Sequence, residues 1–99
     1  MLELNKHRDK LALLCSEYNV ESLYVFGSAS TNSLNADSDI DLLVKFKNFD
    51  IAKYFQNYMD FKSKLKSLFK REIDLLEEQT LKNPILIQSI NKTKEQVYG

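Results

Sequence analysis

The sequence LYVFGS, residues 23–28, is followed after ten mostly polar or small residues by DIDLLV, residues 39–44. Each segment is an apolar run, as expected of a buried strand, and the stretch between them is rich in Ser, Asn and Thr, which favour a loop. Gly27 is the only glycine before the terminal Gly99. The pattern predicts two strands joined by a loop, with a glycine and a hydroxyl group at one strand end and two acids at the next strand start.

The rest of the chain alternates between helical and extended patterns. Apolar residues recur at helical spacing in residues 2–18, 50–69 and 84–92, and residues 72–76 (EIDLL) are predicted to form a third strand. This order predicts an α/β (α+β) fold with a small mixed sheet flanked by helices. The longest helix is expected to bury a broad apolar stripe made of Ile51, Tyr54, Phe55, Tyr58, Met59, Phe61, Leu65, Leu68 and Phe69.

Length and charge limit the classes of function. Ninety-nine residues suffice for a single domain, residues 1–99, with one core. Fourteen basic and fourteen acidic residues balance, so the overall positive charge of a dedicated nucleic-acid-binding protein is absent. The single Cys15 excludes an internal disulfide and is expected to be a buried, inert thiol. No segment resembles a signal peptide or a membrane span, so we expect a cytoplasmic protein.

Three acids occur at the starts or centres of predicted strands. Asp39 and Asp41 are two residues apart, so on a strand both side chains face the same side, with backbones about 7 Å apart. Like charges that close repel one another, and Mg²⁺, which prefers carboxylate and phosphate oxygens, would relieve the repulsion. If the third strand lies beside the second, Asp74 joins the same face. Three carboxylates could then hold two metal ions, one on a triphosphate and one on an attacking hydroxyl, whose proton Asp74 could accept.

Gly27 and Ser28 are of the residue types that would bind the phosphates opposite the acids in such a site. Gly27 lets the backbone approach a phosphate without a Cβ in the way, and Ser28 can donate a hydrogen bond to a phosphate oxygen. Each feature taken alone has a simpler explanation: a Gly-Ser turn, a solvated strand start at Asp39 and Asp41, and an edge-strand acid at Asp74. Their joint occurrence, in this order and on consecutive strands, favours a nucleotide site.

The residue pair 27–28, the ten-residue spacing and Asp39-Ile40-Asp41 resemble the signature of the DNA polymerase β-like nucleotidyltransferase superfamily, and more narrowly the minimal nucleotidyltransferases (MNT). The resemblance extends over essentially the whole chain, including residues 72–76 and the tail 81–99. It implies a mixed sheet flanked by helices, Mg²⁺, and ATP as the substrate. It also implies roles for individual residues: Asp39 and Asp41 as metal ligands, Asp74 as the third carboxylate, and Gly27 and Ser28 as contacts of the β- and γ-phosphates.

The resemblance further implies transfer of a nucleotidyl group to a hydroxyl, with pyrophosphate leaving. Many such proteins are encoded beside an all-helical HEPN ribonuclease toxin and act as its antitoxin, in known cases by adenylylating a tyrosine of the toxin. Two alternatives stay open. One is a binding module that masks a HEPN toxin without chemistry, and the other is a nucleotidyltransferase acting on a small molecule or an RNA end.

The chain departs from the family pattern in the loop after Ser28. Family members often carry a basic residue there, whereas residues 29–33 read ASTNS and hold no positive charge. The triphosphate must then find its cations elsewhere. The sequence offers Lys45, Lys47, Lys53 and Arg71 as candidates.

Overall fold

The sheet has four strands in the order β3-β2-β1-β4 in the part of the chain that the computed structural model describes, residues 7–26, 39–47 and 50–99. β1 pairs antiparallel with both β2 and β4, whereas β2 and β3 run parallel. The sheet is therefore mixed, as predicted. The strands are β1 (Val20–Phe26), β2 (Ile40–Phe46), β3 (Ile73–Glu77) and β4 (Glu95–Tyr98).

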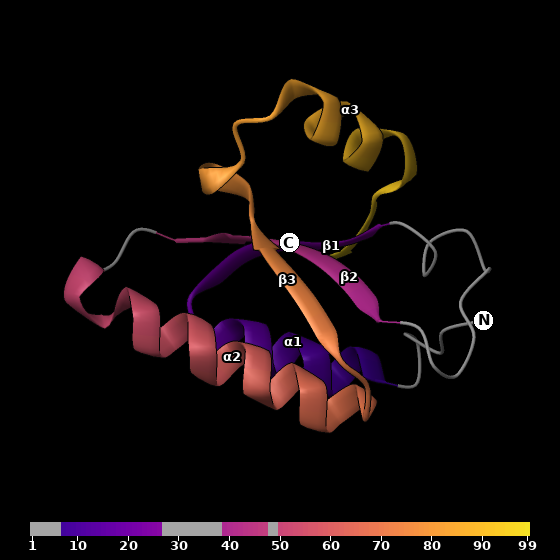
Figure 1. Ribbon diagram of the computed structural model, residues 1–99. Coiled ribbons are helices and arrows are strands. Elements are labelled where there is room, and N and C mark those ends of the chain that lie inside the picture. The colour runs from indigo at the N-terminus through magenta and orange to yellow at the C-terminus, as the bar shows by residue number, and fades with distance from the viewer. Residues whose placement is uncertain (1–6, 27–38, 48–49) are drawn as a thin grey trace.

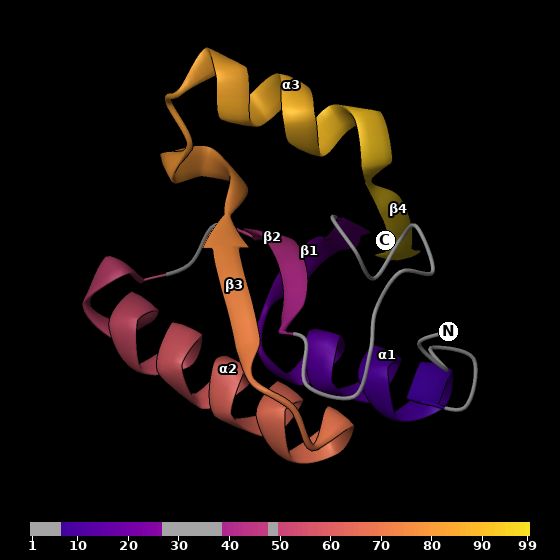
Figure 2. The same cartoon turned by 45° about the vertical axis from the view of Figure 1, so that its right-hand side comes forward.

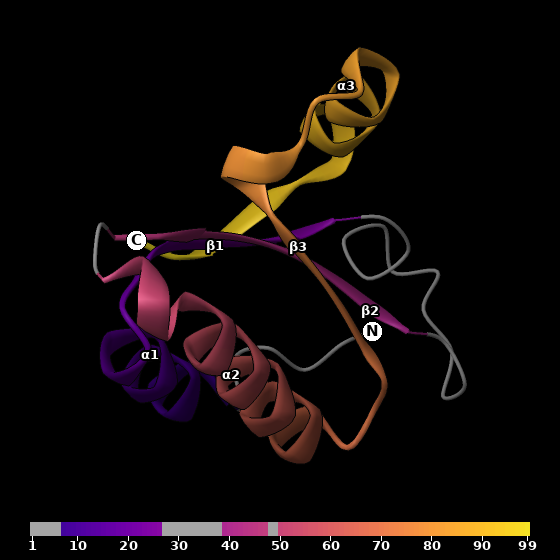
Figure 3. The same cartoon turned by 60° about the vertical axis from the view of Figure 1, so that its left-hand side comes forward.

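Helices cover both faces of this sheet. The helices α1 (Arg8–Glu17) and α2 (Tyr54–Phe69) lie together on one face, and α3 (Pro84–Thr93) lies on the other (Figure 1). Figure 3 shows the three layers from the side. Two short 3-10 turns, η3 (Ile51–Lys53) and η4 (Glu78–Thr80), precede α2 and follow β3. The predicted fold class, a small mixed sheet flanked by helices, is confirmed.

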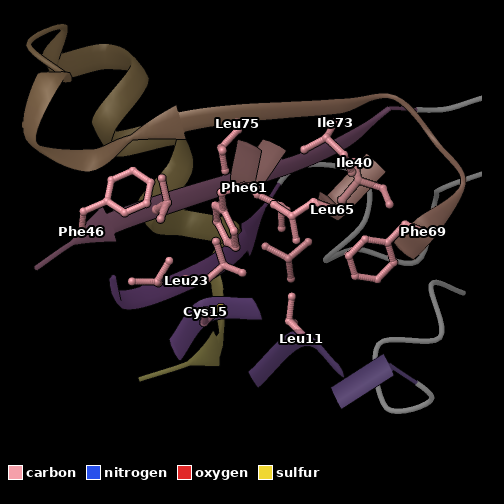
Figure 4. Packing of buried hydrophobic residues seen from close by; sticks show 14 residues of the cluster. Leu11, Cys15, Leu23, Ile40, Phe46, Phe61, Leu65, Phe69, Ile73 and Leu75 are labelled. Carbon is pink, nitrogen blue, oxygen red and sulfur yellow. The ribbon is translucent and has the colours of Figure 1, made fainter. Parts of the chain in front are cut away.

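The main core lies between the sheet and the α1–α2 layer (Figure 4). Ile40, Leu42, Val44 and Phe46 of β2 all point into it, whereas Leu43 packs on the opposite face in a smaller cluster under α3. This alternation follows from the two-residue period of a strand. The other buried members of the main core are Leu11, Cys15, Val20, Leu23, Val25, Phe61, Leu65, Phe69, Ile73 and Leu75.

Cys15 is fully enclosed in this core. Burial raises the pKa of its thiol to about 12, so the thiol stays protonated at neutral pH. The sequence prediction of a buried cysteine is confirmed.

Local capping explains where α3 begins. The side chain of Asn83 accepts hydrogen bonds from the backbone N–H groups of Ile85 and Leu86, and Pro84 occupies the first turn. An Asn cap satisfies N–H groups that have no partner within the helix, and proline has no N–H to lose there. The helix start predicted at Pro84 is confirmed.

Two predictions about the elements were incomplete. The fourth strand, β4, was not predicted, and it extends the sheet beside β1. The buried apolar stripe predicted for the longest helix included too many residues. Ile51, Phe55 and Met59 were expected to be buried and are exposed. A helix on a sheet buries only the side that faces the sheet, which here carries Phe61, Leu65 and Phe69. None of the described helices is long and apolar enough to cross a membrane.

Phe61 and Phe55 provide a matched test of this packing, because both lie on α2 and only Phe61 is enclosed. Phe61 is 0% exposed and Phe55 is 72% exposed. We expect Phe61→Ala to lower the free energy of unfolding by about 3–5 kcal/mol, since it leaves a cavity. Phe55→Ala should change it by less than about 0.5 kcal/mol. Urea denaturation measures both, and equal losses would contradict the described orientation of α2.

Candidate active site at the start of the parallel strands

Asp41 and Asp74 are aligned partners in the parallel pair β2–β3. Their neighbours Ile40 and Ile73 point into the core under α1 and α2. Because successive side chains on a strand alternate between faces, both acids project from the opposite face, the one that carries α3. The sequence placed Asp74 beside Asp41 on the condition that the third strand lies next to the second, and it does.

Asp39 completes the group. It directly precedes β2 and is exposed, as is Asp74, whereas Asp41 is half-buried between them. Burial raises the pKa of the Asp41 carboxyl, and the charges of Asp74 and Asp39 raise it further. Asp41 therefore experiences the negative charge of both other acids, and the three residues named from the sequence share one local environment.

The donor chemistry of this group fits Mg²⁺. No group of three or more His, Cys, Asp or Glu side chains that could hold a metal ion occurs in residues 7–26, 39–47 and 50–99, so further ligands would have to come from the substrate and water. Mg²⁺ is usually bound by one or two carboxylates that are completed by substrate phosphates and water. A cation would also relieve the repulsion around Asp41. Asp39, Asp41 and Asp74 are thus suited to hold Mg²⁺ together with a phosphate-bearing substrate.

The end of β1 lies next to the acids. Phe26, the last residue of β1, is the cross-strand partner of Asp41. Gly27 and Ser28, which follow it in the chain, lie outside the described residues, as does the rest of the loop to residue 38. Their predicted contacts with phosphate stay a prediction.

Three of the four basic residues named from the sequence lie far from the acids. Lys45 is four residues beyond Asp41 on β2, about 13 Å along the strand, and it pairs with Glu21 at 3.0 Å. Lys47 and Lys53 follow the end of β2 and lie farther along the chain still. Arg71 precedes β3 and is therefore at the same end of the sheet as Asp74.

A basic residue that the sequence did not single out lies on the same face as the acids. The ammonium nitrogen of Lys94, at the end of α3, is 4.7 Å from the centre of the Tyr24 ring on β1. The position of Lys94 depends on the pairing of β4 with β1. Only recognition of β4 as a strand could have revealed it.

Comparison with known proteins identifies the family. Residues 9–99 match the family described as Polymerase beta, Nucleotidyltransferase. A candidate protein adenylyltransferase of Methanocaldococcus jannaschii, MJ0128, is 33% identical over 90 residues, which are 90% of this chain and 85% of that protein. The chain therefore belongs to this family and is a nucleotidyltransferase, which confirms the resemblance seen in the sequence.

Solved structures share the fold. A minimal nucleotidyltransferase structure matches with a TM-score of 0.77 and 26% identity, covering 93% of this chain and 90% of that one. A structure of a tri-AMPylated HEPN toxin of Shewanella oneidensis in complex with an MNT antitoxin matches with a TM-score of 0.67 and 21% identity. That match covers 97% of this chain and 72% of the matched chain.

The negative charges around Asp41 predict that replacing Asp41 with a neutral residue stabilises the fold at neutral pH. Because its folded pKa is raised above 3.8, the folded state binds the Asp41 proton more tightly than the unfolded state does. This contribution to stability is present below the unfolded pKa and is lost as pH rises through the folded pKa. We expect Asp41→Asn to be more stable than the wild type at pH 7, with a difference that shrinks below pH 4.

Thermal unfolding between pH 3 and pH 7, without metal, measures that difference. Glu17→Gln is the matched control, because Glu17 is an exposed acid on α1, across the sheet from the acids. A lower melting temperature for Asp41→Asn than for the wild type at pH 7 would contradict this description and would make Asp41 a structural residue.

Proposed function

We propose that this chain is a Mg²⁺-dependent protein adenylyltransferase that transfers AMP from ATP to a hydroxyl of a HEPN toxin and acts as its antitoxin. The observation that carries the proposal is the gathering of Asp39 and Asp74 around Asp41. Two comparisons support it: one relative is a candidate protein adenylyltransferase, and one similar structure holds an AMPylated HEPN toxin with an MNT antitoxin.

The reaction forms a bond between the acceptor oxygen and the α-phosphorus of ATP and breaks the bond to pyrophosphate, which leaves. Asp39 and Asp41 would bind Mg²⁺, and Asp74 would complete a site for two ions. When bound, Mg²⁺ supplies positive charge that neutralises the phosphates and makes the attacking hydroxyl more acidic. Asp74 would accept the proton of that hydroxyl, and Gly27 and Ser28 would hold the β- and γ-phosphates.

The position of Asp74 favours a large acceptor. β3 is an edge strand of the sheet, and Asp74 is exposed on it. An acceptor hydroxyl at the end of a long side chain, such as tyrosine, can therefore approach Asp74 from outside while the rest of the acceptor protein stays on the surface. The exposed edge position of Asp74 thus favours a protein acceptor over a small molecule enclosed in a pocket.

The experiment is incubation of the chain with the protein encoded by the neighbouring gene, ATP and Mg²⁺, followed by intact-mass spectrometry of that protein. We expect its mass to rise in steps of one AMP. The Asp39→Asn/Asp41→Asn variant should add nothing, because it removes both proposed metal ligands, whereas the control Glu17→Gln should act as the wild type.

Other outcomes would contradict the proposal in distinct ways. A stable complex without any mass change would favour an antitoxin that masks the toxin without chemistry. AMP transfer by the double variant at the wild-type rate would show that Asp39 and Asp41 take no part in the reaction. If the two proteins form no complex and the mass does not change, a small-molecule or RNA acceptor would be favoured.

A further inference from the structure

Lys94 lies at the same end of the sheet as the acids. From the end of β3, α3 crosses back over the sheet, and β4 begins directly after it (Figure 2). Lys94 caps the C-terminal end of α3. Its backbone N–H donates a hydrogen bond to the carbonyl oxygen of Ile90 at 2.8 Å. The next residue, Glu95, is the cross-strand partner of Val25. Val25 is one residue before Phe26, the partner of Asp41.

The Lys94 side chain lies over the face that carries the acids. Its ammonium nitrogen is 4.7 Å from the centre of the Tyr24 ring, which packs with Phe26 and Leu43 on the α3 face. Tyr24 is aligned with Leu43, and Asp41 is two residues from Leu43, so Tyr24 and Asp41 are diagonal neighbours about 7–8 Å apart. The Lys94 ammonium is therefore held against a residue that is a diagonal neighbour of Asp41 in the sheet.

We propose that Lys94 binds the β- and γ-phosphates of the nucleoside triphosphate; this inference rests on the proposed function, because it requires the triphosphate to be held at the three acids. A triphosphate carries more negative charge than Mg²⁺ neutralises, and a lysine ammonium is a common point charge for phosphate. The Tyr24 ring holds the Lys94 ammonium in place before the nucleotide arrives. The weak ring contact can then be exchanged for a phosphate oxygen.

The geometry favours Lys94 over the other basic residues near α3. Lys45 shares the face but is engaged with Glu21 and lies four residues beyond Asp41. Lys92 is exposed in the last turn of α3. A structural role for Lys94 is the alternative, since a cation near the end of a helix also stabilises the helix dipole.

Calorimetric titration with Mg²⁺ and either AMP-PNP or AMP separates these roles, because AMP lacks the β- and γ-phosphates. We expect Lys94→Gln to weaken AMP-PNP binding by about tenfold or more, as for the loss of a hydrogen bond between charged groups, and to leave AMP binding unchanged. Lys94→Arg should retain most of the AMP-PNP affinity, because it keeps the charge. Lys92→Gln is the matched control and should bind both nucleotides as the wild type does.

Wild-type affinity of Lys94→Gln for AMP-PNP, with a lower melting temperature, would overturn the inference in favour of a structural role. An equal loss of affinity for AMP and AMP-PNP would also overturn it. A wild-type chain that binds no AMP-PNP in the presence of Mg²⁺ would overturn the proposed function and this inference with it, so the two failures are distinguishable.

Discussion

The site depends on two like charges, Asp41 and Asp74, at aligned positions of neighbouring parallel strands. Repulsion alone would separate them, so their alignment must be enforced elsewhere. Ile73 and Leu75, on either side of Asp74, are buried in the main core, and the Tyr58 hydroxyl of α2 donates a hydrogen bond to the Leu75 carbonyl. A shift of one residue would turn Asp74 into that core. Burial of the apolar residues on either side of Asp74 therefore sets the register of β3 and keeps Asp74 aligned with Asp41.

The two faces of the sheet have different roles, one in stability and the other in the candidate site. The main core stabilises the sheet from the α1–α2 side, while the smaller cluster around Leu43 and Ile90 leaves the acidic end of the other face accessible. Glu77 shows why burial alone does not define a site. Burial raises the pKa of this carboxyl, and its Oε1 makes no hydrogen bond within the described residues. It lies at the far end of β3, however, and belongs to the α1–α2 side.

The sequence was most informative where a short-range rule applies. The two-residue period of a strand placed Asp39 and Asp41 on one face, and the helical pattern that begins at Pro84 marked the start of α3. It was least informative where long-range pairing decides. β4 is only four residues long and begins with two polar residues, so its place beside β1 follows from tertiary pairing. The contact of Lys94 with the Tyr24 ring of β1 depends on that pairing and could not be predicted without it.

The most direct test of this account is the carboxyl pKa of Asp41, measured by NMR titration without metal in the wild type and in Asp74→Asn. We predict a pKa above 3.8 in the wild type, because of burial and its two acidic neighbours, and a lower value in Asp74→Asn. An Asp41 pKa that does not respond to the removal of the Asp74 charge would mean that the two carboxylates do not face one another. The proposed metal site would then have no basis.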